Sequence, residues 1–219
     1  MKLADIHYRC AEFHLLGRYD SAALQIGLRT KDNFITALSY YQLGVYFMSI
    51  DQHAIALQLF NKSLDTKFGT DNSTYTGMVY NDIGVLHGKL GRLDNQIQWL
   101  LKALSIQEQW QEETAVAQIC NNLAVAYNDA GDRLAALPYG KRAVDLRRQL
   151  NDVAGVATSA NNLSLIYLRL DSLDNAFHYQ RVGLQYAEQS GLESRMAECY
   201  INMALLLNRQ KKNPDALVY

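Results

Sequence analysis

Proline and cysteine are scarce in this chain of 219 residues. Its two prolines leave long stretches in which a helix meets no break. Its three cysteines, Cys10, Cys120 and Cys199, lie far apart and form no Cys-x-x-Cys pair, which argues against a disulfide framework and against a structural zinc site. We therefore expect buried thiols that behave as small apolar side chains.

Long apolar runs and an excess of one charge are also missing. No stretch approaches the roughly 18 consecutive apolar residues that a membrane span needs, and the first residues lack the apolar segment of a signal peptide. The formal net charge is -1, with acidic and basic residues interspersed, so no basic patch marks a nucleic-acid or membrane surface. We expect a cytoplasmic protein that binds neither nucleic acid nor membrane through this domain.

Motifs of catalysis are absent as well. The five histidines are scattered, and no phosphate-binding loop, dinucleotide fingerprint, nucleophile elbow or His-Glu-x-x-His motif occurs. His7 and His14 would bind a metal only with ligands supplied from elsewhere, and His87 is expected to be a core residue. The array itself is predicted to be no enzyme and to hold no cofactor or metal, while an enzymatic output domain fused downstream stays open.

A short signature recurs at a fixed spacing along the chain. Each copy is a polar residue, an apolar residue and a small residue, and the copies are Gln42–Gly44, Asp82–Gly84, Asn122–Ala124, Asn162–Ser164 and Asn202–Ala204. A constant period of about 40 residues is typical of repeat proteins, in which each unit buries its apolar face against the next one.

Two positions of the repeat unit hold small residues. Numbering each unit so that the last residue of the signature is position 8, this position holds Cys10, Gly44, Gly84, Ala124, Ser164 and Ala204. Position 20 holds Ala22, Ala56, Ala136, Ala176 and Ala216, with Gln96 as the exception. Small residues allow two helices to approach closely, and Gly, Asp and Ser between the two positions favour a tight turn. Each unit is therefore predicted to be helix, turn, helix, without strands.

The repeat predicts one continuous array of about six units, at residues 2–33, 35–70, 73–110, 113–150, 153–190 and 193–219. The sixth unit stops partway through its second helix without a polar cap, which favours a piece of a longer protein. Pro138 falls inside the second helix of the fourth unit, where we expect a slight bend.

The unit resembles the tetratricopeptide repeat. The resemblance rests on the small position 8, the turn glycine, the alanine at position 20 and an aromatic residue at position 11, held by Phe13, Phe47, Tyr127 and Tyr167. The first interval, from Cys10 to Gly44, has the usual length of this repeat, and each later interval is longer by roughly one helical turn per helix. The resemblance implies an all-α fold, a right-handed superhelical α-solenoid of antiparallel helix pairs whose first helices line the concave side.

Position 6 of the first helix carries a polar residue in five units, namely Gln42, Asp82, Asn122, Asn162 and Asn202. Asparagine is a poor residue for a helix interior, so its repeated use at one register calls for a reason. The pattern is similar to longer-repeat arrays such as kinesin light chain, LGN/Pins scaffolds and Rap-type receptors, in which an asparagine here holds the backbone of a partner peptide. The alternative is that these amides bond neighbouring helices of the array itself.

Three flanking rows complete the predicted binding surface. Position 9 is aliphatic and includes Val85, Val125 and Leu165, which either grip ligand side chains or are partly buried between adjacent first helices. Position 5 holds Tyr41, Asn81, Asn121 and Asn161. Position 13 holds Lys89, Asp129, Arg169 and Arg209, which makes the C-terminal half more basic and suits an acidic or amphipathic segment. Since positions 5 and 6 lack Lys and Arg, a clamp for a C-terminal carboxylate is not expected.

Two functions fit these features. The first is a protein-protein interaction module that binds a peptide or partner segment in its concave groove, as the regulatory or sensory domain of a larger bacterial signalling or transcription-regulating protein. The second is a free-standing adaptor or scaffold that assembles a complex. A homodimer through the uncapped C-terminal unit is a further expected partnership.

Overall fold

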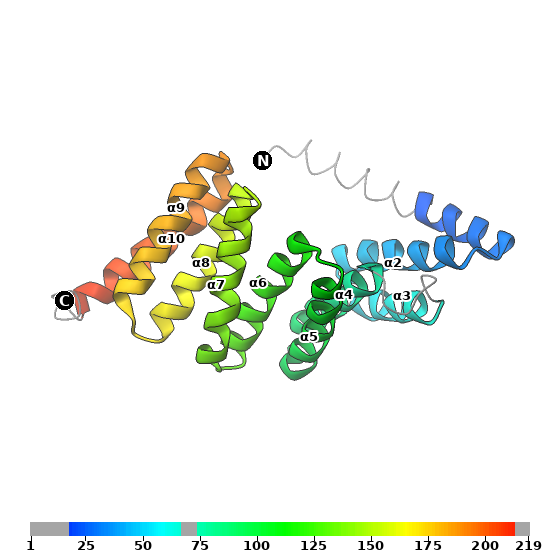
Figure 1. Ribbon diagram of the computed structural model, residues 1–219, viewed down its shortest axis with the longest axis horizontal. Helices are drawn as coiled ribbons and strands as arrows, with labels where there is room; N and C mark the ends of the chain where they lie inside the picture. The colour runs from blue at the N-terminus through cyan, green and yellow to red at the C-terminus, as the bar shows by residue number, and fades with distance from the viewer. Residues whose placement is uncertain (1–17, 67–73, 213–219) are drawn as a thin grey trace. The chain divides into compact units, whose positions relative to one another are not determined.

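The computed structural model describes residues 18–66 and 74–212, and within these ranges every regular element is a helix. The helices are α2 (Asn33–Ser49), α3 (His53–Thr66), α4 (Thr74–Lys89), α5 (Leu93–Gln109), α6 (Glu113–Asp129), α7 (Arg133–Gln149), α8 (Val153–Arg169), α9 (Leu173–Ser190) and α10 (Glu193–Lys212). Residues 18–30 are also helical, and Figure 1 follows the chain through all of them. The predicted all-α class is confirmed.

The helices pack as antiparallel neighbours in the predicted pairs. In residues 1–110, α2 packs along α3 and α4 along α5, and in residues 111–219, α6 packs along α7 and α8 along α9. The helix α10, which is the first helix of the sixth unit, packs on α8 and α9. The helices thus form two compact halves, one within residues 1–110 and one within residues 111–219, and the single array over all six repeats stays a prediction.

Tight turns recur twice as often as the sequence signature. Each turn contains one residue with positive φ, and those within the described ranges are Lys31, Asp51, Gly91, Gln111, Gly131, Asn151, Asp171 and Gly191. Asp32, Asp132 and Asp152 cap the helices that follow, because their side chains accept a backbone N–H three residues on. The predicted unit bounds place breaks close to Lys31 and Gln111, but these residue types give no turn signal of their own, since neither is a usual left-handed turn former.

The left-handed turn residues predict a pair of opposite stability changes. Gly91 has φ 70°, and a Cβ added there would meet no atom within 4 Å, so Gly91→Ala should cost only the backbone strain, about 1 kcal/mol. Lys31→Gly should remove such strain and gain about 0.5 kcal/mol, after the greater freedom of glycine in the unfolded chain is subtracted. Urea unfolding of both variants checks the two signs, and two changes of the same sign would contradict this account.

The small residue at position 8 packs directly against the second helix of its own unit. A Cβ added to Gly44 would lie 2.5 Å from the Phe60 ring, and one added to Gly84 would lie 2.9 Å from Leu100. In the next pair the arrangement is reversed, because alanine stands on the first helix and Gly140 faces it from the second. Each of these three crossings therefore has room for one large side chain at most, which confirms the predicted role of position 8 for Gly44, Gly84 and Ala124.

Position 11 also packs on the second helix. Tyr127 stacks on Tyr139 and Tyr167 stacks on Tyr179, with ring centroids 5.5 Å apart in both pairs. At this position in the third unit, His87 is buried as expected, and burial lowers its pKa. The tyrosine pairs repeat one aromatic contact in two successive units of residues 111–219.

The remaining sequence predictions concern the cysteines, Pro138 and membrane-spanning helices. Cys120 and Cys199 are buried free thiols, as expected, whereas Cys10 lies outside the described residues. Helix α7 continues through Pro138 from Arg133 to Gln149, and the bend there stays a prediction. Within the described residues, no helix combines the length and the apolar character that crossing a bilayer requires.

Candidate functional site

The first helices face one another across successive repeats within each compact unit. Helix α2 contacts α4, and α8 contacts both α6 and α10, whereas among the described residues the second helices α3 and α5, or α7 and α9, have no such contact. Closer spacing on one side curves a stack of helix pairs toward that side. In each unit the surface of the first helices is therefore the inner one, as the family resemblance implied.

A polar ladder links the first helices at positions 5 and 6. Asn162 donates its Nδ2 to Oδ1 of Asn121 at 3.1 Å, and Asn202 donates its Nδ2 to Oδ1 of Asn161 at 2.9 Å. Each bond joins position 6 of one repeat to position 5 of the preceding repeat. The alternative role of the asparagines, bonding neighbouring helices, is thus realised in residues 111–219.

The same step of the ladder occurs in residues 1–110 with different chemistry. The Tyr41 hydroxyl donates to Asp82 Oδ2 at 2.9 Å, and Asn81 donates its Nδ2 to the other carboxylate oxygen at 3.0 Å. Burial and the carboxylate raise the pKa of Tyr41, so the hydroxyl keeps its proton. Gln42, the position 6 residue of this unit, is exposed.

The position 5 residues lie deeper than the sequence predicted. Tyr41, Asn121 and Asn161 are only 6–7% exposed. Asn121 accepts a further hydrogen bond from Ser159, and Asn161 accepts one from Gln180. The prediction placed these side chains on the groove surface, but the structure places them between successive repeats, because the next first helix covers them.

The position 6 amides keep hydrogen-bonding capacity toward the inner surface. Asn122, Asn162 and Asn202 are half-buried. Asn122 accepts a bond from Gln118 on its own helix at 3.2 Å. Asn162 and Asn202 each use one N–H in the ladder, which leaves the Oδ1 atom and the second N–H without a partner in the described part of the chain. These two asparagines can therefore offer one acceptor and one donor to a ligand.

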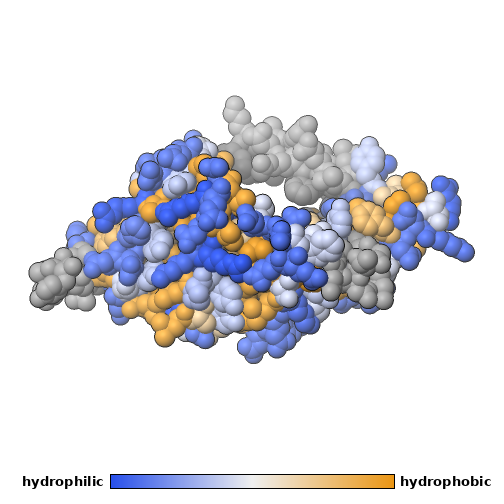
Figure 2. Space-filling model, in the orientation of Figure 1, coloured by the Kyte–Doolittle hydropathy of each residue, from blue (hydrophilic) through white to orange (hydrophobic). Residues whose placement is uncertain are grey.

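The apolar row is partly covered. Val85, Val125 and Leu165 are half-buried, whereas Leu205 on α10 is 50% exposed. The row therefore gains exposure toward the C-terminal end of the described residues. Figure 2 shows hydrophobic and hydrophilic residues interleaved over the face of residues 111–219 that it presents.

The charged row is largely neutralised by acids of the array. Lys89 lies 3.7 Å from Asp51, Arg169 lies 3.5 Å from Asp129, and Arg209 lies 2.7 Å from Asp171. The Arg209 contact is a hydrogen bond, whereas the Arg169 contact is an ion pair without one. The C-terminal half is therefore less basic than predicted. Arg169 and Arg209 still carry N–H groups that make no hydrogen bond within the described residues.

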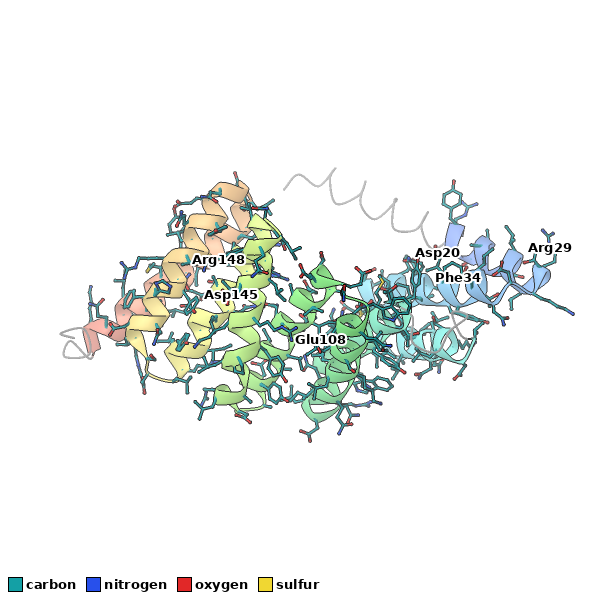
Figure 3. The ribbon with its side chains drawn as sticks, in the orientation of Figure 1. Asp20, Arg29, Phe34, Glu108, Asp145 and Arg148 are labelled. Atoms are coloured by element: carbon teal, nitrogen blue, oxygen red, sulfur yellow. The ribbon has the colours of Figure 1, made fainter. Side chains whose placement is uncertain are left out.

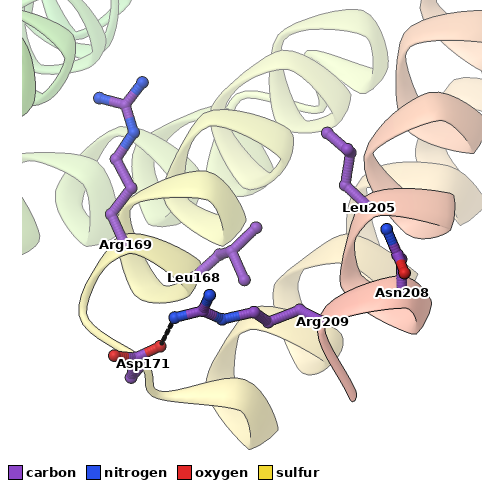
Figure 4. Close-up of a pocket in the computed structure, with 6 residues that line it drawn as sticks. All are labelled: Leu168, Arg169, Asp171, Leu205, Asn208 and Arg209. Atoms are coloured by element: carbon purple, nitrogen blue, oxygen red, sulfur yellow. Dashed lines mark hydrogen bonds and ion pairs between the residues drawn. The ribbon is translucent and has the colours of Figure 1, made fainter. Parts of the chain in front are cut away.

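A pocket of about 370 Å³ lies at the end of α8 and beside α10 (Figure 4), and its lining residues are Leu168, Arg169, Asp171, Leu205, Asn208 and Arg209. Two predicted site residues, Arg169 and Arg209, both line this pocket. Leu205 belongs to the predicted aliphatic row, whereas Leu168, Asp171 and Asn208 escaped the prediction, because only the packing of α10 on α8 brings these residues together.

The described residues contain no group of three His, Cys, Asp or Glu residues that could hold a metal ion. His7 and His14 lie outside the described residues.

Asp82→Asn is expected to raise stability at neutral pH. Burial raises the pKa of the Asp82 carboxyl, and the hydrogen bonds from Tyr41 and Asn81 only partly oppose the shift. The pKa of Asp82 is therefore higher in the folded state than in the unfolded state. The protonated Asp82 contributes to the free energy of unfolding of the wild type below about pH 4, and this contribution is lost as pH rises through the folded-state pKa. The gain in Tm should be largest near neutrality and shrink on acidification. Thermal melts across pH test this, and a gain independent of pH would disprove it.

Comparison with known proteins agrees with this architecture. No curated protein matches the sequence significantly. BtubC (BKLC) from P. vanneervenii has a similar structure, with a TM-score of 0.76 and 19% identity over 93% of this chain and 86% of that chain. Aspartyl phosphate phosphatase F from Bacillus subtilis gives 0.79 and 17%, over 90% of this chain and 51% of that one. At these identities the likeness concerns the fold alone.

A third similar structure is a signal transduction ATPase with numerous domains (STAND) that has a tetratricopeptide repeat sensor, from Pyrococcus horikoshii. Its TM-score is 0.75 at 18% identity, over 93% of this chain and 32% of that chain. Two family models described as tetratricopeptide repeat match residues 75–149 and 156–190, together about half of the sequence. With the helix pairs, the small crossing positions and the constant repeat period, the chain belongs to the tetratricopeptide repeat family.

Proposed function

We propose that this chain is a protein-interaction module that binds an extended partner segment along the inner surface of α6, α8 and α10. The observation that carries the proposal is that Asn162 and Asn202 each make only one side-chain hydrogen bond within the described residues. Buried acceptors of the preceding repeats hold these two amides in place, and each amide still offers one acceptor and one donor. An extended peptide backbone presents the complementary N–H and C=O groups.

Apolar contacts add to this backbone recognition. Leu165 lies three residues beyond Asn162 on α8, and the exposed Leu205 lies three residues beyond Asn202 on α10. Residues three apart are neighbours on one helix face, so each amide has an aliphatic side chain beside it. A bound segment would place apolar side chains on these leucines while its backbone meets the amides.

Selection from a display library of short random peptides tests the proposal. The peptides enriched on the wild type should bind the Asn162→Ala, Asn202→Ala double variant about tenfold more weakly, because two sets of backbone hydrogen bonds are lost. Asn175→Ala, on the second helix α9, is the matched control and should bind as the wild type does. Equal affinity for a double variant that keeps its helical circular dichroism would refute the proposal.

The module is proposed to serve as the sensory or regulatory part of a larger signalling protein. The chain spans 51% of the Bacillus phosphatase and 32% of the STAND protein, whose tetratricopeptide repeats are described as a sensor. The alternative, a free-standing adaptor, is favoured by the 86% coverage of BtubC. Reading the coding sequence beyond Tyr219 separates them: an output domain supports the first, and a stop codon supports the second.

A homodimer through α10 is a second proposed partnership. Tyr200, Ile201 and Leu207 are 47–61% exposed on this helix, and burying such side chains favours association. Light scattering should then give twice the monomer mass, and Ile201→Glu should give the monomer mass. A wild-type protein that stays monomeric at high concentration would exclude the dimer.

A further inference from the structure

Two arginines line the pocket between α8 and α10, and they differ in the hydrogen bonds that they make. Arg209 donates one N–H to Asp171 at 2.7 Å, and this bond holds its guanidinium at the Asp171 side of the pocket (Figure 4). Arg169 extends from the end of α8 with its guanidinium directed away from that pair (Figure 4). Its only ion-pair partner in the described residues is Asp129, at 3.5 Å without a hydrogen bond. Arg169 is therefore the less satisfied of the two.

The hydrogen-bond donors of the pocket exceed its acceptors. A guanidinium carries five N–H groups, and Arg209 uses one of them in the pocket while Arg169 uses none on a described residue. The amide of Asn208 is exposed beside them, and Leu168 and Leu205 supply apolar surface. Such a lining matches a ligand group with several acceptor oxygens on a short aliphatic stem.

We propose that this pocket binds an acidic side chain, aspartate or glutamate, of the partner segment that lies along Asn162 and Asn202. This inference rests on the proposed function and adds a specificity site to it. The ligand carboxylate would accept hydrogen bonds from the unused N–H groups of Arg209 and, once the Arg169 guanidinium turns from Asp129 toward the pocket, from Arg169, while its methylene groups contact Leu205. Asn202 and Leu205 lie on the same face of α10, so one segment reaches both.

The proposal predicts that a substitution of Asp171, a residue of the pocket itself, strengthens the binding of acidic peptides. Its carboxylate lies inside the pocket and competes with a ligand carboxylate for Arg209. Asp171→Asn removes this negative charge but keeps a residue that tolerates the left-handed backbone, φ 55° at this turn. The variant should therefore bind acidic peptides more tightly than the wild type, whereas Arg169→Gln should bind them more weakly.

The experiment uses a random peptide library displayed with fused C-termini, so that only side chains supply carboxylates. Peptides enriched on the wild type should carry Asp or Glu at one fixed position. The Glu→Gln version of such a peptide should bind the wild type about fivefold more weakly. That difference should shrink in Arg169→Gln, vanish when Arg209→Gln is added to it, grow in Asp171→Asn, and persist in the control Arg148→Gln, which changes an exposed arginine of α7.

The outcomes separate this site from the proposed function. Peptides that depend on Asn162 and Asn202 but show no acidic preference would overturn the pocket assignment and leave the binding surface intact. An acidic preference that survives Arg169→Gln together with Arg209→Gln would also overturn it. If no enriched peptide depends on the two asparagines, the proposed function fails, and the pocket assignment fails with it.

Discussion

Replacing Arg147 by methionine is expected to lower the free energy of unfolding by about 3–5 kcal/mol. This arginine is only 6% exposed, although it is charged. Its Nη1 donates to the Gly155 carbonyl at 2.8 Å and to Ser159 Oγ at 2.9 Å, and its Nη2 donates to Gln118 at 2.7 Å. The side chain of α7 thus joins its own first helix, α6, to the first helix of the next unit, α8.

Removing the guanidinium leaves buried acceptors without donors, and methionine fills the volume but makes no hydrogen bond. Asp152 adds an ion pair at 3.8 Å from Nε. Burial lowers the pKa of Arg147, opposed by that carboxylate, so the charge costs desolvation that these partners offset.

The control for Arg147→Met is the same change at its neighbour Arg148, which is exposed on α7 and labelled in Figure 3. Arg148→Met should alter stability by less than about 0.5 kcal/mol. Chemical denaturation of both variants gives the two free energies. Similar losses for the two arginines would mean that the buried network contributes little, as found where ion pairs are replaced by apolar groups.

The second large effect is expected at Phe60, which is fully buried in α3. Phe60→Ala should cost about 3–5 kcal/mol, because the lost transfer free energy adds to the cavity left against Tyr41 and its neighbours. The Tyr41 ring lies 6.0 Å from the Phe60 ring, centroid to centroid. Denaturant unfolding measures the loss.

A double-mutant cycle with Gly44 shows whether the helix crossing itself is responsible. In the wild type, Gly44→Ala should destabilise by about 1–3 kcal/mol, since its Cβ would lie 2.5 Å from the Phe60 ring. In the Phe60→Ala background the same change should stabilise, because the space is open and alanine favours the helix by about 1 kcal/mol. The unit with Ala124 facing Gly140 already has this reversed arrangement. A Gly44→Ala effect of the same sign in both backgrounds would contradict the proposed packing.

The sequence predicted the helix pairs well because their signals are local or periodic. Small residues at position 8, turn formers after the first helix and an aromatic residue at position 11 act within one unit. In the helix pairs from α2 to α9, turns follow the first helices, and Tyr127 and Tyr167 pack on the second helices as expected. Lys31 and Gln111 show the limit of such local signals. Their left-handed backbone is imposed by the packed helices on both sides, since neither side chain prefers it.

The sequence alone determined the repeat period, the all-helical class and the row of polar residues on the first helices. Only the tertiary structure showed that Asn121 and Asn161 are buried acceptors while Asn162 and Asn202 retain hydrogen-bonding capacity. Positions 5 and 6 are about 100° apart on a helix, and both lie near the edge of the packing face. Which of them is covered depends on the placement of the first helix of the next repeat. The same placement brings Arg169 and Arg209 to one pocket. The repeat period in the sequence predicts which way a side chain points from its helix, whereas the position of the neighbouring helix decides what that side chain contacts.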